Sequence, residues 1–546
     1  MLVEALYRGQ FNCWDERRPR ARALAVSAGR IIAFDDEAES LEKEAARKED
    51  FGSRPVFPGF HDAHCHTTGF GIGLDELDLS SPPLGSLDSL YQAVATRAAS
   101  LAPGELLVGR GYDQNKLGGH PEIGRLDAAA GGRPVWLKHT SGHLSMVNSA
   151  ALELIGPALD AEIGGGAVVR DEQGRPTGLL QERAQSLVQR LVLPRSTSEL
   201  ARAIARAHEV YVEEGITSVC DAGIAGGWIG QSPLELAAYQ LAREEGGLKV
   251  RSTVMLSADL LGPVAAHGDD FAEEARATVA GLRSGLGDEW LRIGPVKVFA
   301  DGSLIGRTCY MEEDFADAAG NRGYLQAPAE ELRATIIGAH LAGWQVATHA
   351  IGDAAVSFTL DCYAEALARL PKPDHRLRIE HCGVTSDRSL RRLADLAVVP
   401  VPQGRFVGEI GDGMARALGP ERARLAYRMA SFLRAGAVLP GSSDRPVVRG
   451  APLLGIADMV LRSTESGEEF APEEAISVEE AMRAYSAGSA FAERCESERG
   501  SLALGQLADF VVLGEDPRRV APGEIPAIPV LATAVHGALV ADRRRP

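Results

Sequence analysis

The feature that most constrains the fold is a unit that repeats through the middle of the chain: a short apolar strand, a loop and then an amphipathic helix. Eight strands are predicted, at 56–66, 215–223, 249–256, 291–302, 344–353, 377–382, 396–403 and 437–444. Helices rich in Ala, Leu, Glu and Arg lie between several of them, for example PAEELRATIIGAHLAG. Strands that alternate with helices predict a parallel sheet, and eight of them predict a closed (β/α)8 TIM barrel of the α/β class.

An open, doubly wound sheet is the main structural alternative to the closed barrel. Its nucleotide-binding form carries a GxGxxG motif directly after the first strand, and no such motif follows the first strand here. We therefore expect the barrel. In a barrel, the polar residues at the C-terminal ends of the strands meet in one pocket.

The two ends of the chain are rich in predicted strands and lack the helical rhythm of the middle. We expect residues 1–55 and 501–546 to form one small β-sandwich beside a barrel of residues 56–500. A Gly-rich insertion at about 79–200 separates the first two barrel strands. Because the insertion leaves from the C-terminal end of strand one, it is expected to lie over the active-site face.

Composition and charge narrow the function classes. The chain has 57 Lys+Arg and 75 Asp+Glu, a net charge of -18. This acidic balance argues against binding to nucleic acid or to an anionic membrane surface. The 7 cysteines include no CxxC motif, and no apolar run is long enough to span a membrane, so a cytoplasmic protein is expected. On frequency alone, a homodimer is the expected oligomer.

The sharpest motif is His64-Cys65-His66, at the end of the first predicted strand. Residues i and i+2 of a strand point to the same side, so both imidazoles can bind one cation. Asp62 shares that side, whereas His61 points the other way. Taken alone, the motif fits a metal site and also fits two histidines that simply pack at a strand end.

Four further polar residues fall where the barrel predicts a pocket. His349, His381 and Asp444 end their strands, and Lys297 lies within another. Each has a structural alternative when taken singly: a buried histidine, a turn or helix-cap aspartate, or a lysine paired with Asp301. Taken together, four imidazoles and a carboxylate at converging strand ends are a ligand set suited to zinc or another divalent transition metal.

These residues resemble the pattern of the amidohydrolase superfamily. The resemblance rests on PGFHDAHCH, Lys297, His349, His381, Asp444 in GSSDRP, and the C-terminal GSLALGQLADFVVLGEDP. More narrowly, VKVFADGSLIGRT, SGHLSMVNSAAL, TGLLQERA and ATHAIGDAA resemble the YtcJ-like branch, also called amidohydrolase 3, which includes N-substituted formamide deformylase. The resemblance covers nearly the whole chain, including the insertion.

The resemblance implies roles for these residues. His64 and His66 would bind one metal, His349 and His381 a second, and Lys297, carboxylated by carbon dioxide, would bridge them. An ammonium beside two cations is disfavoured, whereas a carbamate supplies a bridging anion. Some members use one metal, so one or two divalent ions, zinc first among them, are expected.

The same resemblance implies a hydrolase of a carbon–nitrogen bond in a small amide-like molecule, such as an N-substituted formamide or an N-acyl compound. Asp444 would contact the metal and transfer protons, and His143, in the insertion, would contact the reacting group. Asp113 and Arg307 are weaker candidates for substrate contacts, and Arg307 equally fits an ion pair with a neighbouring acid. Ester hydrolysis or decarboxylation at the same site is the enzymatic alternative. A non-catalytic scaffold is disfavoured because every expected ligand position is filled.

Overall fold

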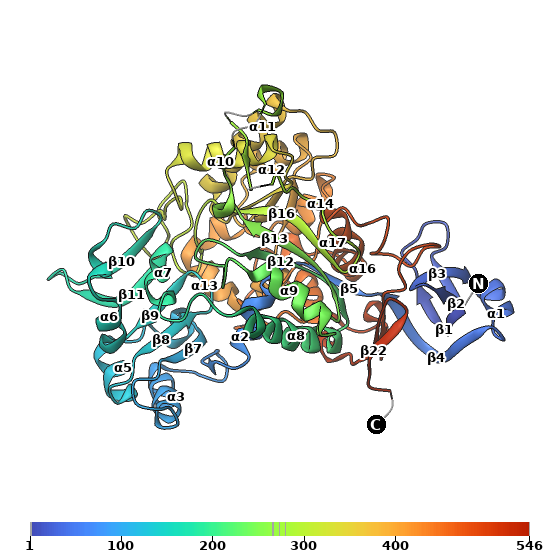
Figure 1. Ribbon diagram of the computed structural model, residues 1–546, viewed down its shortest axis with the longest axis horizontal. Helices are drawn as coiled ribbons and strands as arrows, with labels where there is room; N and C mark the ends of the chain where they lie inside the picture. The colour runs from blue at the N-terminus through green and yellow to red at the C-terminus, as the bar shows by residue number, and fades with distance from the viewer. Residues whose placement is uncertain (1–2, 265–266, 272–273, 279, 545–546) are drawn as a thin grey trace.

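A seven-stranded, all-parallel sheet forms the centre of the molecule (Figure 1). The computed structural model describes residues 3–264, 267–271, 274–278 and 280–544. In sheet order the strands are β5 (Phe60–Cys65), β12 (Ile216–Ile224), β13 (Arg251–Ser257), β16 (Leu291–Phe299), β17 (Val346–Ala350), β18 (Arg378–His381) and β19 (Val399–Val401). Sheet order follows chain order, as in a barrel wound in one direction.

The eighth predicted strand, 437–444, is not a strand in the structure. Its last residues nevertheless line up along β5: the Ala63 amide donates to the Gly441 carbonyl at 3.0 Å, and the Asp444 amide donates to the His64 carbonyl at 2.7 Å. Asp444 has a φ of 59°, which breaks the extended conformation that a strand requires. The barrel is therefore nearly closed, with an irregular segment in the place of strand eight.

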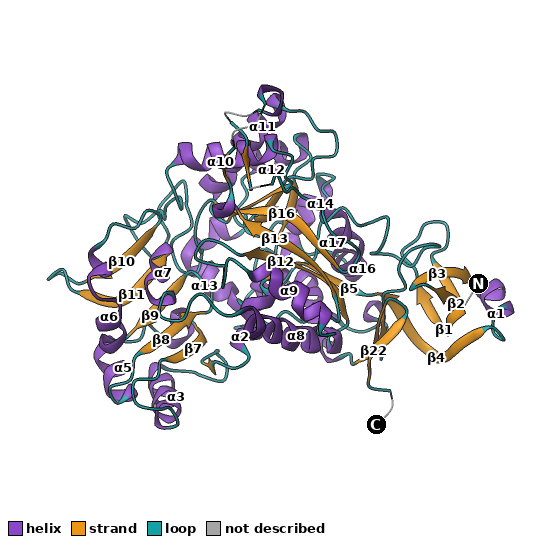
Figure 2. Cartoon of the chain, in the orientation of Figure 1, coloured by secondary structure: helices purple, strands orange, loops and turns teal. Residues whose placement is uncertain are grey.

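Helices cover the outside of this sheet because each presents an apolar stripe to it (Figure 2). In α8 (Thr197–Glu213), for example, Leu200, Ile204 and Tyr211 are buried against the sheet side, one or two helical turns apart. The other long helices around the barrel are α9 (Glu235–Glu244), α10 (Ala329–Leu341), α11 (Asp353–Arg369), α12 (Asp387–Asp395), α13 (Gly404–Ala423) and α15 (Pro452–Leu461). Among the described residues, no helix is both long enough and apolar enough to cross a membrane.

A second seven-stranded sheet joins the two ends of the chain. Its order is β22 (Ala538–Asp542), β21 (Val530–Val535), β20 (Phe510–Leu513), β4 (Ala45–Pro58), β1 (Val3–Asn12), β2 (Arg20–Ser27) and β3 (Arg30–Phe34). β4 pairs with β1 and with β20, so it connects the N-terminal and C-terminal strands. Aromatic rings of Tyr7, Phe51 and Phe510 pack together across this junction, with centroids 5.0–5.8 Å apart.

The insertion after β5 has its own six-stranded sheet, at the left of Figure 1. The strands, in sheet order, are β10 (Gly166–Arg170), β11 (Pro176–Glu182), β9 (Leu144–Val147), β8 (Val135–His139), β7 (Leu107–Tyr112) and β6 (Leu77–Asp78). The predicted domain boundaries at 55, 79, 200 and 501 stay a prediction. β4 runs across the first of them.

Candidate metal centre and substrate pocket

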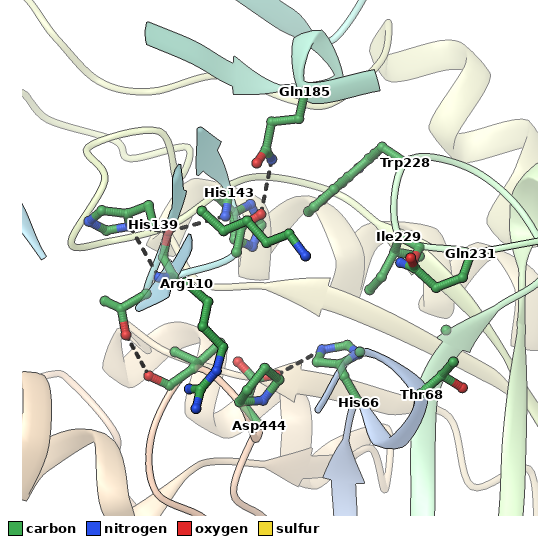
Figure 3. Close-up of a pocket in the computed structure, with 18 of the residues that line it drawn as sticks. His66, Thr68, Arg110, His139, His143, Gln185, Trp228, Ile229, Gln231 and Asp444 are labelled. Atoms are coloured by element: carbon green, nitrogen blue, oxygen red, sulfur yellow. Dashed lines mark hydrogen bonds and ion pairs between the residues drawn. The ribbon is translucent and has the colours of Figure 1, made fainter. Parts of the chain in front are cut away.

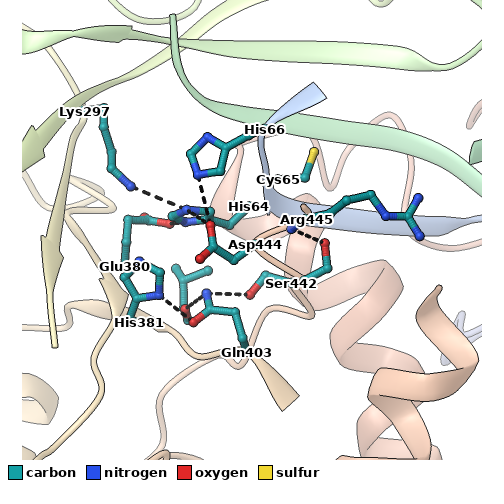
Figure 4. Close-up of polar contacts among 12 residues, drawn as sticks. His64, Cys65, His66, Lys297, Glu380, His381, Gln403, Ser442, Asp444 and Arg445 are labelled. Carbon is teal, nitrogen blue, oxygen red and sulfur yellow. Dashed lines mark hydrogen bonds and ion pairs between the residues drawn. The ribbon is translucent and has the colours of Figure 1, made fainter. Parts of the chain in front are cut away.

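Three of the predicted ligands form one compact cluster at the end of β5 (Figure 4). His66 Nε2 lies 3.0 Å and His64 Nε2 lies 3.2 Å from Asp444 Oδ1. That oxygen is buried, and no aligned hydrogen bond reaches it from any described residue. Two ring nitrogens and a carboxylate oxygen that converge in this way fit the ligands of a divalent transition metal.

The loop that carries Asp444 is tied to β5 by a second carboxylate. Asp62 Oδ1 accepts from the Ser443 amide at 3.0 Å and from the His64 amide at 3.1 Å. Burial raises the pKa of Asp62 to about 6. Asp62 therefore orders the backbone on both sides of the cluster.

The orientation of His64 is set by a buried ion pair. Arg378 donates to Glu380 through Nε at 2.7 Å and through Nη2 at 2.9 Å, and the Oε2 atom that accepts from Nη2 also accepts from His64 Nδ1. Burial raises the pKa of Glu380, but Arg378 and His64 outweigh burial and hold it well below its usual range. A carboxylate only accepts, so Nδ1 carries the proton of His64 and Nε2 faces the cluster.

His381 and His349 are oriented in the same manner. His381 Nδ1 donates to Gln403 Oε1 at 2.7 Å, and His349 Nε2 donates to the Gly302 carbonyl at 3.1 Å. Their rings are 4.5 Å apart, centroid to centroid, and the His381 ring is 5.0 Å from that of His64. In each of these three histidines one nitrogen donates to the protein, which leaves the other with a free lone pair. This is the arrangement that metal-binding histidines adopt.

Lys297 is buried beside the cluster. Its Nζ lies 3.4 Å from His64 Nε2 and 4.8 Å from the centroid of the Phe299 ring. Burial lowers the pKa of Lys297 to about 8. The alternative pairing with Asp301 is wrong: the Asp301 carboxylate accepts backbone amides of Tyr310, Ile351 and Gly352 at 2.8–3.0 Å.

A cavity of about 170 Å³ opens from the cluster toward the insertion (Figure 3). His66, Lys297, His349, His381 and Asp444 line its inner end. The outer wall combines insertion residues with the loop after β12, and its lining includes His139, His143, Gln185, Trp228 and Gln231. The insertion therefore lies over the active-site face, as the barrel topology predicts.

His143 lies where the sequence places it, next to the cluster. Its ring centroid is 5.1 Å from that of His349 and 5.2 Å from that of Trp228. Burial lowers the pKa of His143, but the Glu182 carboxylate, 2.6 Å from Nδ1, outweighs burial and raises it. A basic imidazole thus faces the inner end of the cavity.

Two weaker candidates lie elsewhere. Asp113 caps α4 (Gln114–Leu117): its Oδ1 accepts from the Asn115 amide at 2.8 Å. Arg307 forms a two-pronged ion pair with Asp317. Neither residue is among those that line the cavity. Local partners therefore satisfy both side chains in this structure, and the substrate contacts expected for Asp113 and Arg307 stay predictions.

Sequence reasoning missed the residues that orient the histidines, and it missed an aromatic wall. Glu380 directly precedes His381, and with Arg378 it makes an alternating charged pattern in β18, which is a detectable signal for a buried pair. Gln403 and Trp228 gave no comparable signal. Trp228, Trp136 and Phe299 all line the pocket.

The chain belongs to the amidohydrolase family, which it matches over residues 50–541. It is similar to YtcJ of Bacillus subtilis (strain 168), with 30% identity over 552 residues that cover 99% of this chain and 100% of YtcJ. It is 29% identical to N-substituted formamide deformylase of Arthrobacter pascens, covering 97% of this chain and 96% of the deformylase. These matches confirm the resemblance to the YtcJ-like branch.

Among solved structures, the chain resembles an uncharacterized metal-dependent hydrolase from Pyrococcus horikoshii OT3. The TM-score is 0.73 at 25% identity, and the match covers 95% of this chain and 99% of that one. A second such hydrolase, from Pyrococcus furiosus, gives a TM-score of 0.70 at 27% identity, covering 94% and 100%. The fold is thus the amidohydrolase fold, including the insertion and the terminal sheet.

Proposed function

We propose that this protein is a metal-dependent hydrolase that cleaves the carbon–nitrogen bond of a small amide-like substrate. The observation that carries the proposal is the convergence of His64, His66 and Asp444 at the inner end of a cavity. His381, His349 and Lys297 lie around that cluster. The named relatives support the reaction class, since one is an N-substituted formamide deformylase and the similar solved structures are described as metal-dependent hydrolases.

His64, His66 and Asp444 would hold one divalent ion, with zinc the metal that this donor set suits best. His349 and His381 would hold a second where two are bound. When bound, such an ion polarises a carbonyl and lowers the pKa of a water from about 15.7 to about 7. The orientation of His64 by Glu380, of His381 by Gln403 and of His349 by the Gly302 carbonyl supports this assignment.

Lys297 would be carboxylated and would bridge two ions. In that reaction the neutral Nζ amine adds to the carbon of carbon dioxide, a C–N bond forms, and the nitrogen releases one proton. The support is the burial of Lys297 and its position 3.4 Å from His64 Nε2, where an ammonium would face the same cations as the histidines.

Asp444 would transfer the protons. Burial raises the pKa of Asp444, but His64 and His66 outweigh burial and hold it well below its usual range, so the carboxylate is ionised. It accepts a proton from the attacking water and returns it to the leaving nitrogen, so that amide and water give an acid and an amine. His143 would contact the carbonyl oxygen or the leaving group from the opposite wall.

One experiment tests the reaction class. The purified protein is stripped with a chelator, reloaded with zinc, manganese or cobalt, and assayed against N-formyl amines, N-acyl amines, cyclic amides and matched esters. We expect amine release that disappears on stripping and returns with one of the metals. Turnover of esters alone, or release of carbon dioxide in place of amine, would overturn the carbon–nitrogen assignment and favour the alternative chemistry.

A further inference from the structure

Glu182, at the end of β11, contacts His143 through both its backbone and its side chain. The Glu182 amide donates to the His143 carbonyl at 2.8 Å, and the carboxylate Oε2 lies 2.6 Å from His143 Nδ1. Glu182 is fully buried. Since a carboxylate accepts and does not donate, His143 donates from Nδ1, which directs Nε2 away from Glu182.

The backbone of Glu182 is strained. Its φ of 51° and ψ of −127° lie in a region that residues with a side chain rarely occupy. Such conformations persist where the surrounding structure enforces them, and they cluster at functional sites. A glycine would adopt this conformation without strain, so the carboxylate is the feature that distinguishes glutamate at this position.

The second carboxylate oxygen packs against the barrel at Gly302. A Cβ atom on Gly302 would lie 2.3 Å from Glu182 Oε1, so only glycine allows this approach. The carbonyl of the same Gly302 accepts from His349 Nε2 at 3.1 Å. One residue of the loop after β16 therefore touches the insertion through Glu182 and orients a candidate metal ligand of the barrel.

We infer that Glu182 is a positioning residue for catalysis: it holds His143 with Nε2 toward the reacting atoms and seats the insertion against the loop that orients His349. This inference rests on the proposed function, because it acts through the role proposed for His143. The three observations that carry it are independent of one another: the double contact, the strained backbone and the close approach to Gly302.

The test compares Glu182→Gln, His143→Ala and the double variant, with Glu153→Gln as the matched control. Glu153 is an exposed acid on α6 (Ser149–Ile155) of the same insertion. We expect Glu182→Gln to lower kcat by roughly 10–100-fold, as for other residues that orient active-site histidines, with metal content and KM nearly unchanged. The double variant should be no slower than His143→Ala, because Glu182 acts through that ring.

Two outcomes would overturn the inference: a wild-type kcat in Glu182→Gln, or a double variant whose loss equals the product of the single losses. A crystal structure of Glu182→Ala gives a readout that needs no substrate. There we expect the His143 ring to leave its position, and an unmoved ring would overturn the inference even where the wild type hydrolyses none of the amides tested. Failure of the proposed function would appear separately, as a wild type without metal or turnover.

Thermal unfolding of Glu182→Gly and Glu182→Ala separates folding from positioning. Glycine relieves the positive φ, so Glu182→Gly should unfold at a higher temperature than Glu182→Ala while both lose activity equally. Restored activity in the glycine variant would overturn the role of the carboxylate, since glycine retains only the backbone contact with His143.

Discussion

The inner and outer ends of the active-site cavity are built by different means. At the inner end, His64, His381 and Asp444 stand at the ends of β5 and β18 and on the segment that replaces strand eight. A backbone hydrogen bond ties Asp444 to His64, and pairing with β12 and β17 holds β5 and β18 in the barrel sheet. At the outer end, His143 and Trp228 come from loops and the insertion, and side-chain contacts hold them. In the proposed function, the barrel would supply the chemistry and the insertion would supply much of the surface that meets the substrate.

The largest effect is expected from replacing the candidate metal ligands at the inner end of the cavity. Replacing His64 and His66 together by Ala should lower bound metal and abolish turnover, because two of the three converging ligands are lost. Elemental analysis and amide hydrolysis measure the two effects, and circular dichroism checks the fold. Unchanged metal content in this double variant would contradict the ligand assignment.

Asp444→Asn isolates proton transfer from metal binding. An amide oxygen still reaches the cluster but does not accept the proton of water, so kcat should fall by about 10²–10⁴-fold while part of the metal remains. Stopped-flow or endpoint amine assays give kcat, and elemental analysis gives the metal. A wild-type kcat in this variant would show that Asp444 is not the general base.

The inner end was largely predictable from sequence, and the physical reason is periodicity. Strand alternation places His64 and His66 on one side, and barrel closure brings His349, His381 and Asp444 to the same pocket whatever the loops do. The irregular segment at 437–444 escaped prediction because its apolar run resembles a strand, although no residue of it forms a strand and Asp444 has a positive φ.

The outer end was not predictable because it depends on contacts between distant segments. Glu182, at the end of β11, contacts His143, which directly precedes β9. Trp228, in the loop after β12, contacts Phe299 at the end of β16, at a centroid distance of 5.2 Å. No local sequence pattern predicts such contacts between distant segments. For Arg307 the sequence left an ion pair and a substrate contact equally open, and the structure shows the pair with Asp317.

Lys297→Ala decides how many ions the inner end holds. A carboxylated lysine predicts loss of the second metal and a fall in activity of about 10–100-fold, partly reversed by acetate or bicarbonate. Metal stoichiometry of wild type and variant, with and without these anions, is the measurement. One metal in the wild type, insensitive to bicarbonate, would remove the bridging role and leave the hydrolase assignment intact.

Trp228→Ala probes the outer wall alone. The indole packs against His143 and Phe299 but lies on the loop after β12, away from the candidate ligands. We expect KM to rise by about tenfold, equivalent to about 1.4 kcal/mol, with metal content unchanged. A fall in bound metal would show that the two ends of the cavity are coupled.

Asp113→Ala and Arg307→Ala give the smallest expected effects, and they test whether these two side chains belong to the outer wall of the cavity. Asp113 caps α4 and Arg307 pairs with Asp317, so each change should lower the free energy of unfolding, by about 1 kcal/mol for the lost cap and by less than about 1 kcal/mol for the ion pair. Because neither side chain lines the cavity, kcat and KM should stay within about twofold of wild type, the range expected of changes away from a site. Denaturant unfolding and steady-state kinetics measure the two quantities separately. A large rise in KM for Arg307→Ala without loss of stability would show that the Asp317 pair opens to admit the substrate, and it would support the substrate contact that the sequence left open.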